Sequence, residues 1–213
     1  MTTEIMNIHM ALTELKMLDK RIEAAINDGE WVIANKHSNT KIAGVDLKDF
    51  AETIKSRHQK VTSLIARAEA IKRAVVNSNA VTKVVIAGKE YTVAEAIEMK
   101  NHGVERKKML IFRLHTDYTH AKVSADRANG AELERRADDY VRTMIGTTDV
   151  KGMTAEVKRM RDEFIAAQTM ELVDPIGVLK QMEVLNEELT AFETNVDAAL
   201  SVSNALTQIT IVY

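Results

Sequence analysis

Apolar residues recur at steps of three and four along most of this chain, which is the spacing of one face of an α-helix. The first such seam predicts a helix from Glu4 to about Asn27, ended by Asp28 and Gly29. Its seam positions are Ile5, Ile8, Leu12, Leu15, Leu18, Ile22 and Ala25. Residues 30–44 have no sustained period, so we expect a loop there, with room for a short hairpin and with Trp31 as a packing anchor.

A strict heptad seam begins at Leu47, and Arg57 is its one charged position. The seam consists of Leu47, Phe50, Ile54, Arg57, Val61, Leu64, Ala68, Ile71 and Val75. Thr82–Ile86 is then β-branched, Ala87 and Gly88 fit a tight turn, and Glu90–Thr92 returns as a second strand. The sequence therefore predicts a hairpin at residues 82–92, inserted between two long helices.

Four further helices are expected after this hairpin. Thr92 and Glu95 form a capping box that opens a long helix from Val93 to about Ala128. A fourth helix ends at Gly146, Thr147–Gly152 reads as a loop, and a fifth helix has the seam Val157, Met160, Phe164 and Ala167. The sixth begins with Asp174 as N-cap and Pro175 in its first turn. Its seam is Val178, Met182, Leu185, Leu189, Phe192, Val196 and Ala199.

One short phrase occurs twice, each time after a helical seam. SNAVTKVVI starts at Ser78 and SNALTQITI starts at Ser203. We interpret both copies as the joint at which a helix turns into a strand, and we expect the two strands to share one small sheet with Glu90–Thr92. The alternative interpretation is that Asn79 and Asn204 contact a ligand.

These elements predict a mainly α fold over a single domain of residues 1–213. Long antiparallel helices would form a coiled-coil-like bundle, with a small β-sheet made of the hairpin and a C-terminal strand at residues 206–212. The seams are narrow, about two positions in seven, and narrow seams favour packing between long helices within or between chains. We therefore expect a homo-oligomer.

Composition agrees with this fold and excludes several classes of protein. Aromatic residues make up 4% of the 213 residues, proline occurs once and cysteine is absent, so disulfides and thiolate metal sites are excluded. The net charge of −2 gives no basic field, and we expect no nucleic-acid partner. No apolar run is long enough for a membrane span, and the start MTTEIMNIHM does not resemble a signal peptide, so we expect a soluble, unprocessed protein.

Four segments together carry a resemblance to a known family. They are LDKRIEAAI near the start, SNAVTKVVIAGKEYTVAEAI, the ELVDPIG turn at Glu171–Gly177, and the ending VDAALSVSNALTQITI. Across most of its length the chain resembles an uncharacterised helical family of phages, prophages and some bacteria, sometimes labelled septicolysin. The resemblance implies a viral origin and a compact, oligomeric helical protein. The label suggests a pore-forming toxin, but the sequence has no membrane-spanning segment and no basic amphipathic helix rich in large apolar residues, so we do not adopt it.

Common enzyme signatures are absent from the sequence. There is no phosphate-binding GxxxxGK[ST] or GxGxxG motif, no HExxH, no GxSxG and no cysteine nucleophile. His115 and His120 are five residues apart, which on a helix separates them by about 140° and suits no shared metal. We therefore predict no catalytic residues, no metal site and no cofactor.

The candidate binding residues are those that break an apolar seam. Arg57, Lys100 and Lys107 fall where a bundle needs aliphatic side chains, and His115 and Tyr118 lie further along the third helix. A lone buried charge costs several kcal/mol unless it is paired or hydrated. In one interpretation the aliphatic parts of these side chains pack in the bundle while their charged ends reach water or glutamates. In the other, the cations bind the phosphates of a ligand while Tyr118 stacks on its base. A second, weaker set surrounds Tyr140 and consists of Arg135, Arg136 and Arg142.

Two hypotheses of function follow. The first is a non-enzymatic, phage-type oligomer in the host cytoplasm that binds and sequesters a small anionic, nucleotide-derived ligand of host defence. The second is a virion structural or assembly protein, favoured by long heptad helices, terminal strands suited to exchange, and many Met and Ala residues for interfaces.

Overall fold

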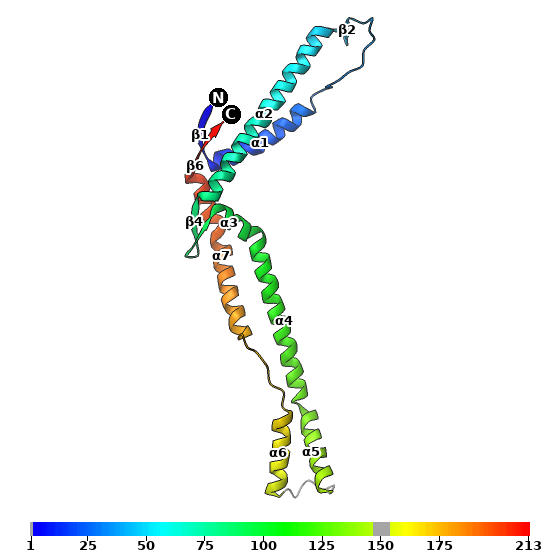
Figure 1. Cartoon of the computed structure of the whole chain (residues 1–213), viewed down its shortest axis with the longest axis vertical. Helices are drawn as coiled ribbons and strands as arrows, with labels where there is room; N and C mark the ends of the chain where they lie inside the picture. Colours follow the sequence, from blue (N-terminus) through cyan, green and yellow to red (C-terminus); the bar gives the residue numbers. More distant parts are fainter. Residues whose placement is uncertain (1, 147–153) are drawn as a thin grey trace. The chain divides into compact units, whose positions relative to one another are not determined.

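The computed structural model describes residues 2–146 and 154–213, and the predicted loop at Thr147–Gly152 lies outside these residues. The fold is mainly α-helical with small antiparallel sheets, as expected (Figure 1). Its helices are α1 (Ile8–Ile26), α2 (Leu47–Val81), α3 (Val93–Glu98), α4 (Val104–Ala128), α5 (Ala131–Ile145), α6 (Ala155–Gln168) and α7 (Val178–Leu206), with a π-helical segment at Met99–Gly103. Its strands are β1 (Thr3–Asn7), β2 (Lys41–Ile42), β3 (Val45–Asp46), β4 (Lys83–Ile86), β5 (Lys89–Thr92) and β6 (Gln208–Val212).

The described chain divides into two compact units, and the single domain of residues 1–213 stays a prediction. The first unit contains residues 1–102 and 191–213, and the second contains residues 103–190. One boundary falls in the π-helical segment and the other falls inside α7.

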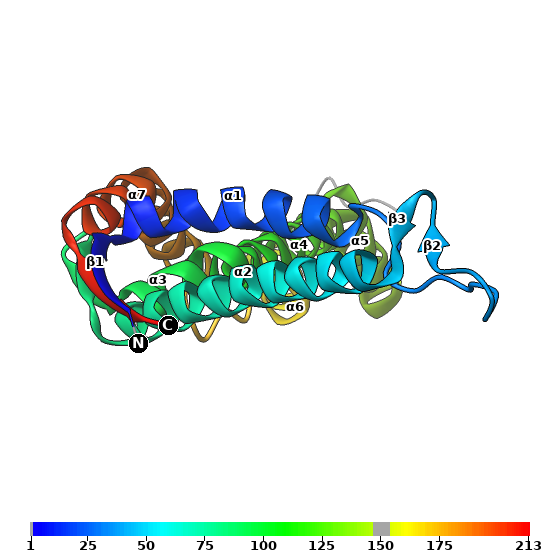
Figure 2. The same cartoon turned by 90° about the horizontal axis from the view of Figure 1, so that it is seen from above.

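The core of the first unit lies where α1, α2 and the terminal strands meet. Figure 2 shows α1 and α2 side by side, with β1 and β6 at one end. The core cluster of buried side chains consists of Met6, Ile8, Ala11, Leu18, Ile71, Val75, Ile209 and Ile211. All but two of these residues belong to the seams of α1 and α2 or to the C-terminal strand, so the predicted apolar faces form this core.

The C-terminal strand pairs with the N-terminus and not with the hairpin, so the predicted three-stranded sheet is wrong. β6 is antiparallel to β1, with Thr3 opposite Val212 and Asn7 opposite Gln208, while β4 pairs with β5. The predicted helix start at Glu4 is wrong for the same reason. The Asn7 side chain caps α1 by accepting a hydrogen bond from the Met10 amide at 2.8 Å, which leaves the preceding residues extended and free to pair.

Both copies of the repeated phrase are the last turn of a helix. The Thr82 amide donates to the Ser78 carbonyl at 2.8 Å, and the Thr207 amide donates to the Ser203 carbonyl at 2.9 Å. A strand follows within two residues of each threonine. The phrase therefore ends a helix in both places, as expected for such a joint, but the two strands that follow enter different sheets.

A second repeat shapes both hairpins. Ile-Ala-Gly joins β2 to β3 and also joins β4 to β5. Ala43 and Gly44 have φ values of 50° and 85°, and Ala87 and Gly88 have 51° and 77°. A two-residue turn with positive φ at both positions is the type I′ geometry that matches the twist of paired strands. The tight turn predicted at Ala87–Gly88 is confirmed. Residues 41–46 form a hairpin with the same type of turn directly before α2.

The long third helix is interrupted, and the last helix begins later than expected. The capping box of Thr92 and Glu95 is present and opens α3, but the segment from Met99 to Gly103 is π-helical before α4 continues. The last helix starts at Val178, and not at Pro175, because the Asp174 carboxylate accepts the Val178 amide at 2.9 Å. The predicted seam of α7 is confirmed: Leu189, Phe192 and Val196 are buried.

Candidate functional site

The five predicted binding residues are divided between the two units. Arg57 and Lys100 belong to the first unit, whereas Lys107, His115 and Tyr118 belong to the second. Arg57 precedes the end of α2 by 24 residues, or about 36 Å of helix. The start of α3 lies at that end, because the Val93 amide donates to the Thr82 carbonyl at 2.8 Å. Arg57 and Lys100 are therefore far apart within the first unit.

The two lysines that break the predicted seam both meet carboxylates of α7. The Lys100 ammonium lies 2.5 Å from Asp197, and the Lys107 ammonium lies 2.8 Å from Glu188. Lys100 is exposed and Lys107 is half-buried. This agrees with the interpretation in which the charged ends of these lysines pair with acidic side chains and do not bind a phosphate. Because both pairs are open to water, each adds little to stability.

Arg57 lies beside the end of α1 and contacts Trp31. Its Nη1 donates to the Glu30 carbonyl at 3.4 Å, and its guanidinium is 6.0 Å from the centre of the Trp31 ring. The Trp31 indole N–H donates to the Ile26 carbonyl at 2.9 Å, and its ring meets His58 edge to face at 6.5 Å. Trp31 thus ties the loop to both helices, which is the anchoring role we expected.

The groove beside Arg57 has a mixed charge. Its volume is about 570 Å³, and its lining consists of Asp28, Asp49, Glu52, Thr53, Ser56, Arg57 and Lys60. Three carboxylates outnumber the two cations, so a phosphate in this groove would meet repulsion as well as attraction. The charge of the groove therefore does not favour an anionic ligand.

Tyr118 and His115 lie on α4, beyond Lys107. Tyr118 is half-buried on the same face as Lys107, about 16 Å further along the helix, and His115 is exposed. Sequence reasoning placed Lys107 and Tyr118 on one face correctly. Whether the pair contacts a ligand stays a prediction.

The second candidate set makes ion pairs on the surface of α5 and packs against α6. Arg135 pairs with Glu132 at 2.6 Å and holds the pKa of that carboxyl below its ordinary value. Arg142 pairs with Asp139 at 3.2 Å, and the ring of Tyr140 stacks on Phe164 at 4.7 Å. Arg136 donates to Gln168. The stacking of Tyr140 and the bond of Arg136 join α5 to α6, and the two ion pairs lie within α5, so these contacts account for the cluster without a ligand.

One cation that sequence reasoning missed is Arg67 on α2. It makes ion pairs with Glu4 of β1, at 3.0 Å, and with Glu14 of α1, and its guanidinium lies 4.6 Å from the centre of the Tyr213 ring. The hydrogen bonds that Arg67 donates to Glu14 and Glu4 raise the pKa of Arg67, although partial burial opposes them. No local sequence pattern could reveal this cluster, because its members come from four separate segments.

An apolar groove of about 530 Å³ lies between β4 and the last turns of α7. Val85, Val202 and Leu206 line it, and each is more than half exposed. Small residues, Ala198 and Ala199, form part of its wall. The groove has no charged side chain apart from Lys83, so its chemistry is that of a packing surface.

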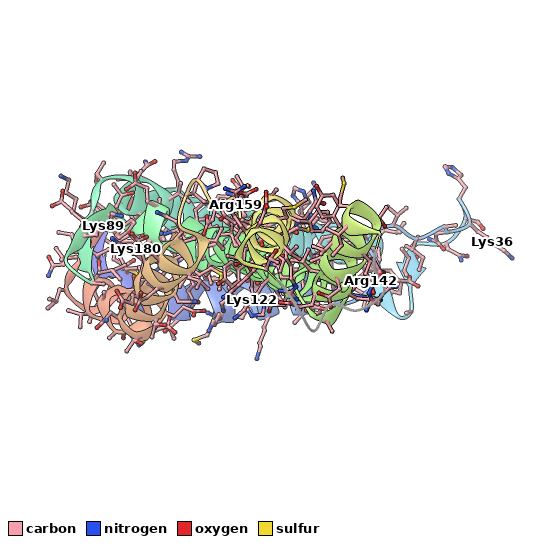
Figure 3. All side chains as sticks on the ribbon, turned by 90° about the horizontal axis from the view of Figure 1, so that it is seen from below. Lys36, Lys89, Lys122, Arg142, Arg159 and Lys180 are labelled. Atoms are coloured by element: carbon pink, nitrogen blue, oxygen red, sulfur yellow. The ribbon has the colours of Figure 1, made fainter. Side chains whose placement is uncertain are left out.

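Several other cations lie on the protein surface. Lys89, Lys122 and Arg159, labelled in Figure 3, each project away from the helix or hairpin that carries them. Among the described residues no group of three His, Cys, Asp or Glu side chains is placed to hold a metal ion. Within the same residues no helix is long and apolar enough to cross a membrane.

Comparison with known proteins adds no relative to this picture. No protein family model, no curated protein and no solved structure matches the chain.

Proposed function

We propose that this chain is a non-enzymatic assembly protein that works as a homo-oligomer, the second of the two hypotheses drawn from the sequence. The observation that carries the proposal is the amount of surface that a single chain leaves open. The chain exposes 15,223 Å². A compact monomer of 23.8 kDa exposes about 9,900 Å², and two separate compact bodies of the sizes of the two units expose about 12,000 Å² together.

This excess is larger than an ordinary interface requires. It amounts to about 3,000 Å² per chain, whereas a stable standard-size interface buries about 800 Å² of each partner. Long helices that pack on few neighbours produce such an excess, and contact with further copies removes it. The open surface therefore supports self-association over more than one contact.

The second unit contributes much of the exposed apolar surface. Among its described residues twelve large apolar side chains are exposed, whereas five apolar side chains are buried. Val104 is the one buried residue of α4, and α6 has none. Helices with so few buried side chains are marginal in water unless a neighbour covers them. This imbalance supports an assembly in which helices of the second unit pack against other chains.

The ligand-sequestering hypothesis has weaker support from the same side chains. Lys100 and Lys107 already have carboxylate partners, and the groove at Arg57 carries more acids than bases. An anion would have to displace these pairs before it could bind. The phage origin, the nucleotide-derived ligand and the location in a host cell or virion all stay predictions.

Molar mass in solution tests the proposal. We expect light scattering at micromolar concentration to give a discrete multiple of 23.8 kDa and a melting temperature that rises with protein concentration. A mass of one chain at the highest concentration would overturn it. Nucleotides and cyclic dinucleotides, added in the same melting assay, distinguish assembly from ligand sequestration. Stabilisation by one of them that is lost in Lys107→Ala, but kept in the neighbouring Lys108→Ala, would favour sequestration.

A further inference from the structure

Helix α4 is apolar on two opposite faces. One face is the predicted seam, which carries Val104, Lys107, Ile111 and Leu114, and whose Lys107 is tied to Glu188 of α7. The second face carries Met109, Phe112 and Val123, which are 63%, 72% and 59% exposed. At 3.6 residues per turn the two rows lie about 150° apart around the helix. A surface helix in a finished fold has one apolar side, so the second row requires a partner.

The second row is bounded by opposite charges. Glu105 lies on it one turn before Met109, and Arg127 lies on it one turn after Val123. Thr116 and Thr119 fall between Phe112 and Val123 on the same row, where their small side chains permit close approach of another helix. We call residues 105, 109, 112, 116, 119, 123 and 127 the outer row of α4.

This charge order selects the partner and its direction. We propose that the outer row of α4 packs antiparallel against the outer row of a second copy, around a two-fold axis near Thr116. This inference rests on the proposed self-assembly and names one of its contacts. In a two-fold contact each residue pair occurs twice, so Glu105 of either copy meets Arg127 of the other. Parallel packing would instead bring Glu105 beside Glu105 and Arg127 beside Arg127, and like charges oppose association.

Apolar matching agrees with the antiparallel direction. Around an axis at Thr116, Met109 of one copy comes opposite Val123 of the other, and each Phe112 lies about 6 Å, one turn, from the axis. A central aromatic side chain surrounded by smaller apolar contacts is the usual arrangement of an interface that binds well. The contact is about 33 Å long, the length of helix between residues 105 and 127.

Charge reversal tests the direction of packing. We expect Glu105→Arg or Arg127→Glu alone to weaken dimerisation, measured by sedimentation equilibrium, by about tenfold, and the double variant to return to within about threefold of the wild type. The two side chains are about 33 Å apart in one chain, so rescue cannot arise within a monomer. A double variant that dimerises no better than either single variant would overturn the proposal.

Apolar substitution and cross-linking test the surface itself. Phe112→Glu should weaken the dimer by at least about a hundredfold, because Phe112 is 72% exposed and lies within about one turn of the axis in both copies. Leu110→Glu is the matched control, since Leu110 is exposed on the same helix but outside the outer row. The natural chain has no cysteine, so Thr116→Cys introduces a single thiol. A short bis-maleimide should join two Thr116→Cys chains but not two Ser124→Cys chains.

The outcomes separate this inference from the function on which it rests. If the wild type is a monomer, self-assembly and the antiparallel contact both fail. If the wild type is an oligomer that Phe112→Glu leaves intact, the proposed function stands and the outer row is not the interface.

Discussion

The side-chain amide of Asn129 pairs with the backbone of Met170 through two hydrogen bonds. Its oxygen accepts the Met170 amide at 2.7 Å, and its nitrogen donates to the Met170 carbonyl at 2.8 Å. One asparagine thus provides both bonds of a strand-like pair and joins the end of α4 to the chain that leaves α6. Asn129 is also the C-cap residue of α4, and its backbone N–H donates to the Ala125 carbonyl.

Asn129→Ala should lower the free energy of unfolding of the second unit by about 1 to 2 kcal/mol, because two neutral hydrogen bonds are lost. The expected local effect is faster hydrogen exchange at the Met170 amide. Urea unfolding and exchange mass spectrometry measure the two effects. Asn27→Ala is the matched control, since Asn27 caps α1 and its side chain bonds within its own helix, to Glu23. Equal protection of Met170 in Asn129→Ala and wild type would contradict this role.

Arg67→Lys should destabilise the first unit by about 1 to 2 kcal/mol. Lysine keeps the positive charge, but it has no planar fork to reach Glu4 and Glu14 together and stacks less well on Tyr213. Because Glu4 is 41% exposed, solvent reduces the contribution of its ion pair. Chemical unfolding measures the change.

Arg73→Lys provides the comparison for Arg67→Lys, because Arg73 is an exposed arginine of the same helix. It should leave stability within about 0.5 kcal/mol of wild type. If the two substitutions had the same small effect, the Arg67 cluster would have no special role in joining β1, α1 and α2.

Acid should weaken the start of α3 through Glu95. Hydrogen bonds from the Thr92 backbone and hydroxyl lower the pKa of Glu95 below its ordinary value of 4.5. The folded pKa is therefore below the unfolded one. Its stabilising contribution is fully present above the unfolded pKa of about 4.5 and is lost as the pH falls through the folded value.

Glu95→Gln removes this titration while keeping an oxygen that accepts from Thr92. We expect the stability of Glu95→Gln to depend less steeply on pH below about 4.5 than that of the wild type. Thermal unfolding at a series of pH values measures the slope. A steeper slope in Glu95→Gln would contradict the assigned direction.

The hairpin turn at Ala87 should accept a stabilising change. Ala87 has φ of 51°, a conformation that costs an alanine about 1 kcal/mol and that asparagine adopts more readily. Ala87→Asn should therefore raise stability by about 0.5 to 1 kcal/mol, and Gly88→Ala should lower it by about 1 kcal/mol. Differential scanning calorimetry measures both shifts. If Ala87→Asn were destabilising, the type I′ turn between β4 and β5 would be in doubt.

Local signals in the sequence predicted most of the helices and the hairpin. The seam of α7, the capping box at Thr92 and the turn at Ala87–Gly88 depend on residues within a turn or two of one another, so the sequence is sufficient for them. The predicted start of the first helix, at Glu4, was wrong because Ile5 fits the helical spacing by coincidence although it belongs to a strand. Asn7, a strong N-cap residue, was the local signal that places the boundary later.

The candidate site shows the same division. The sequence identified Lys100 and Lys107 as polar breaks in a seam, but their partners, Asp197 and Glu188, are more than 80 residues away in the chain. Pattern alone gave two open interpretations of these lysines. Only the tertiary contacts place a carboxylate at each one.

The sequence by itself determined which segments are helical, which face of each helix is apolar and where most of them end, because these properties depend on neighbours three or four residues apart. The tertiary structure decided that β6 pairs with β1, that Arg67 gathers Glu4, Glu14 and Tyr213, and that the outer row of α4 stays open. Those contacts depend on which segments distant in the sequence pack together, and the spacing of apolar residues along the chain does not specify these long-range partners.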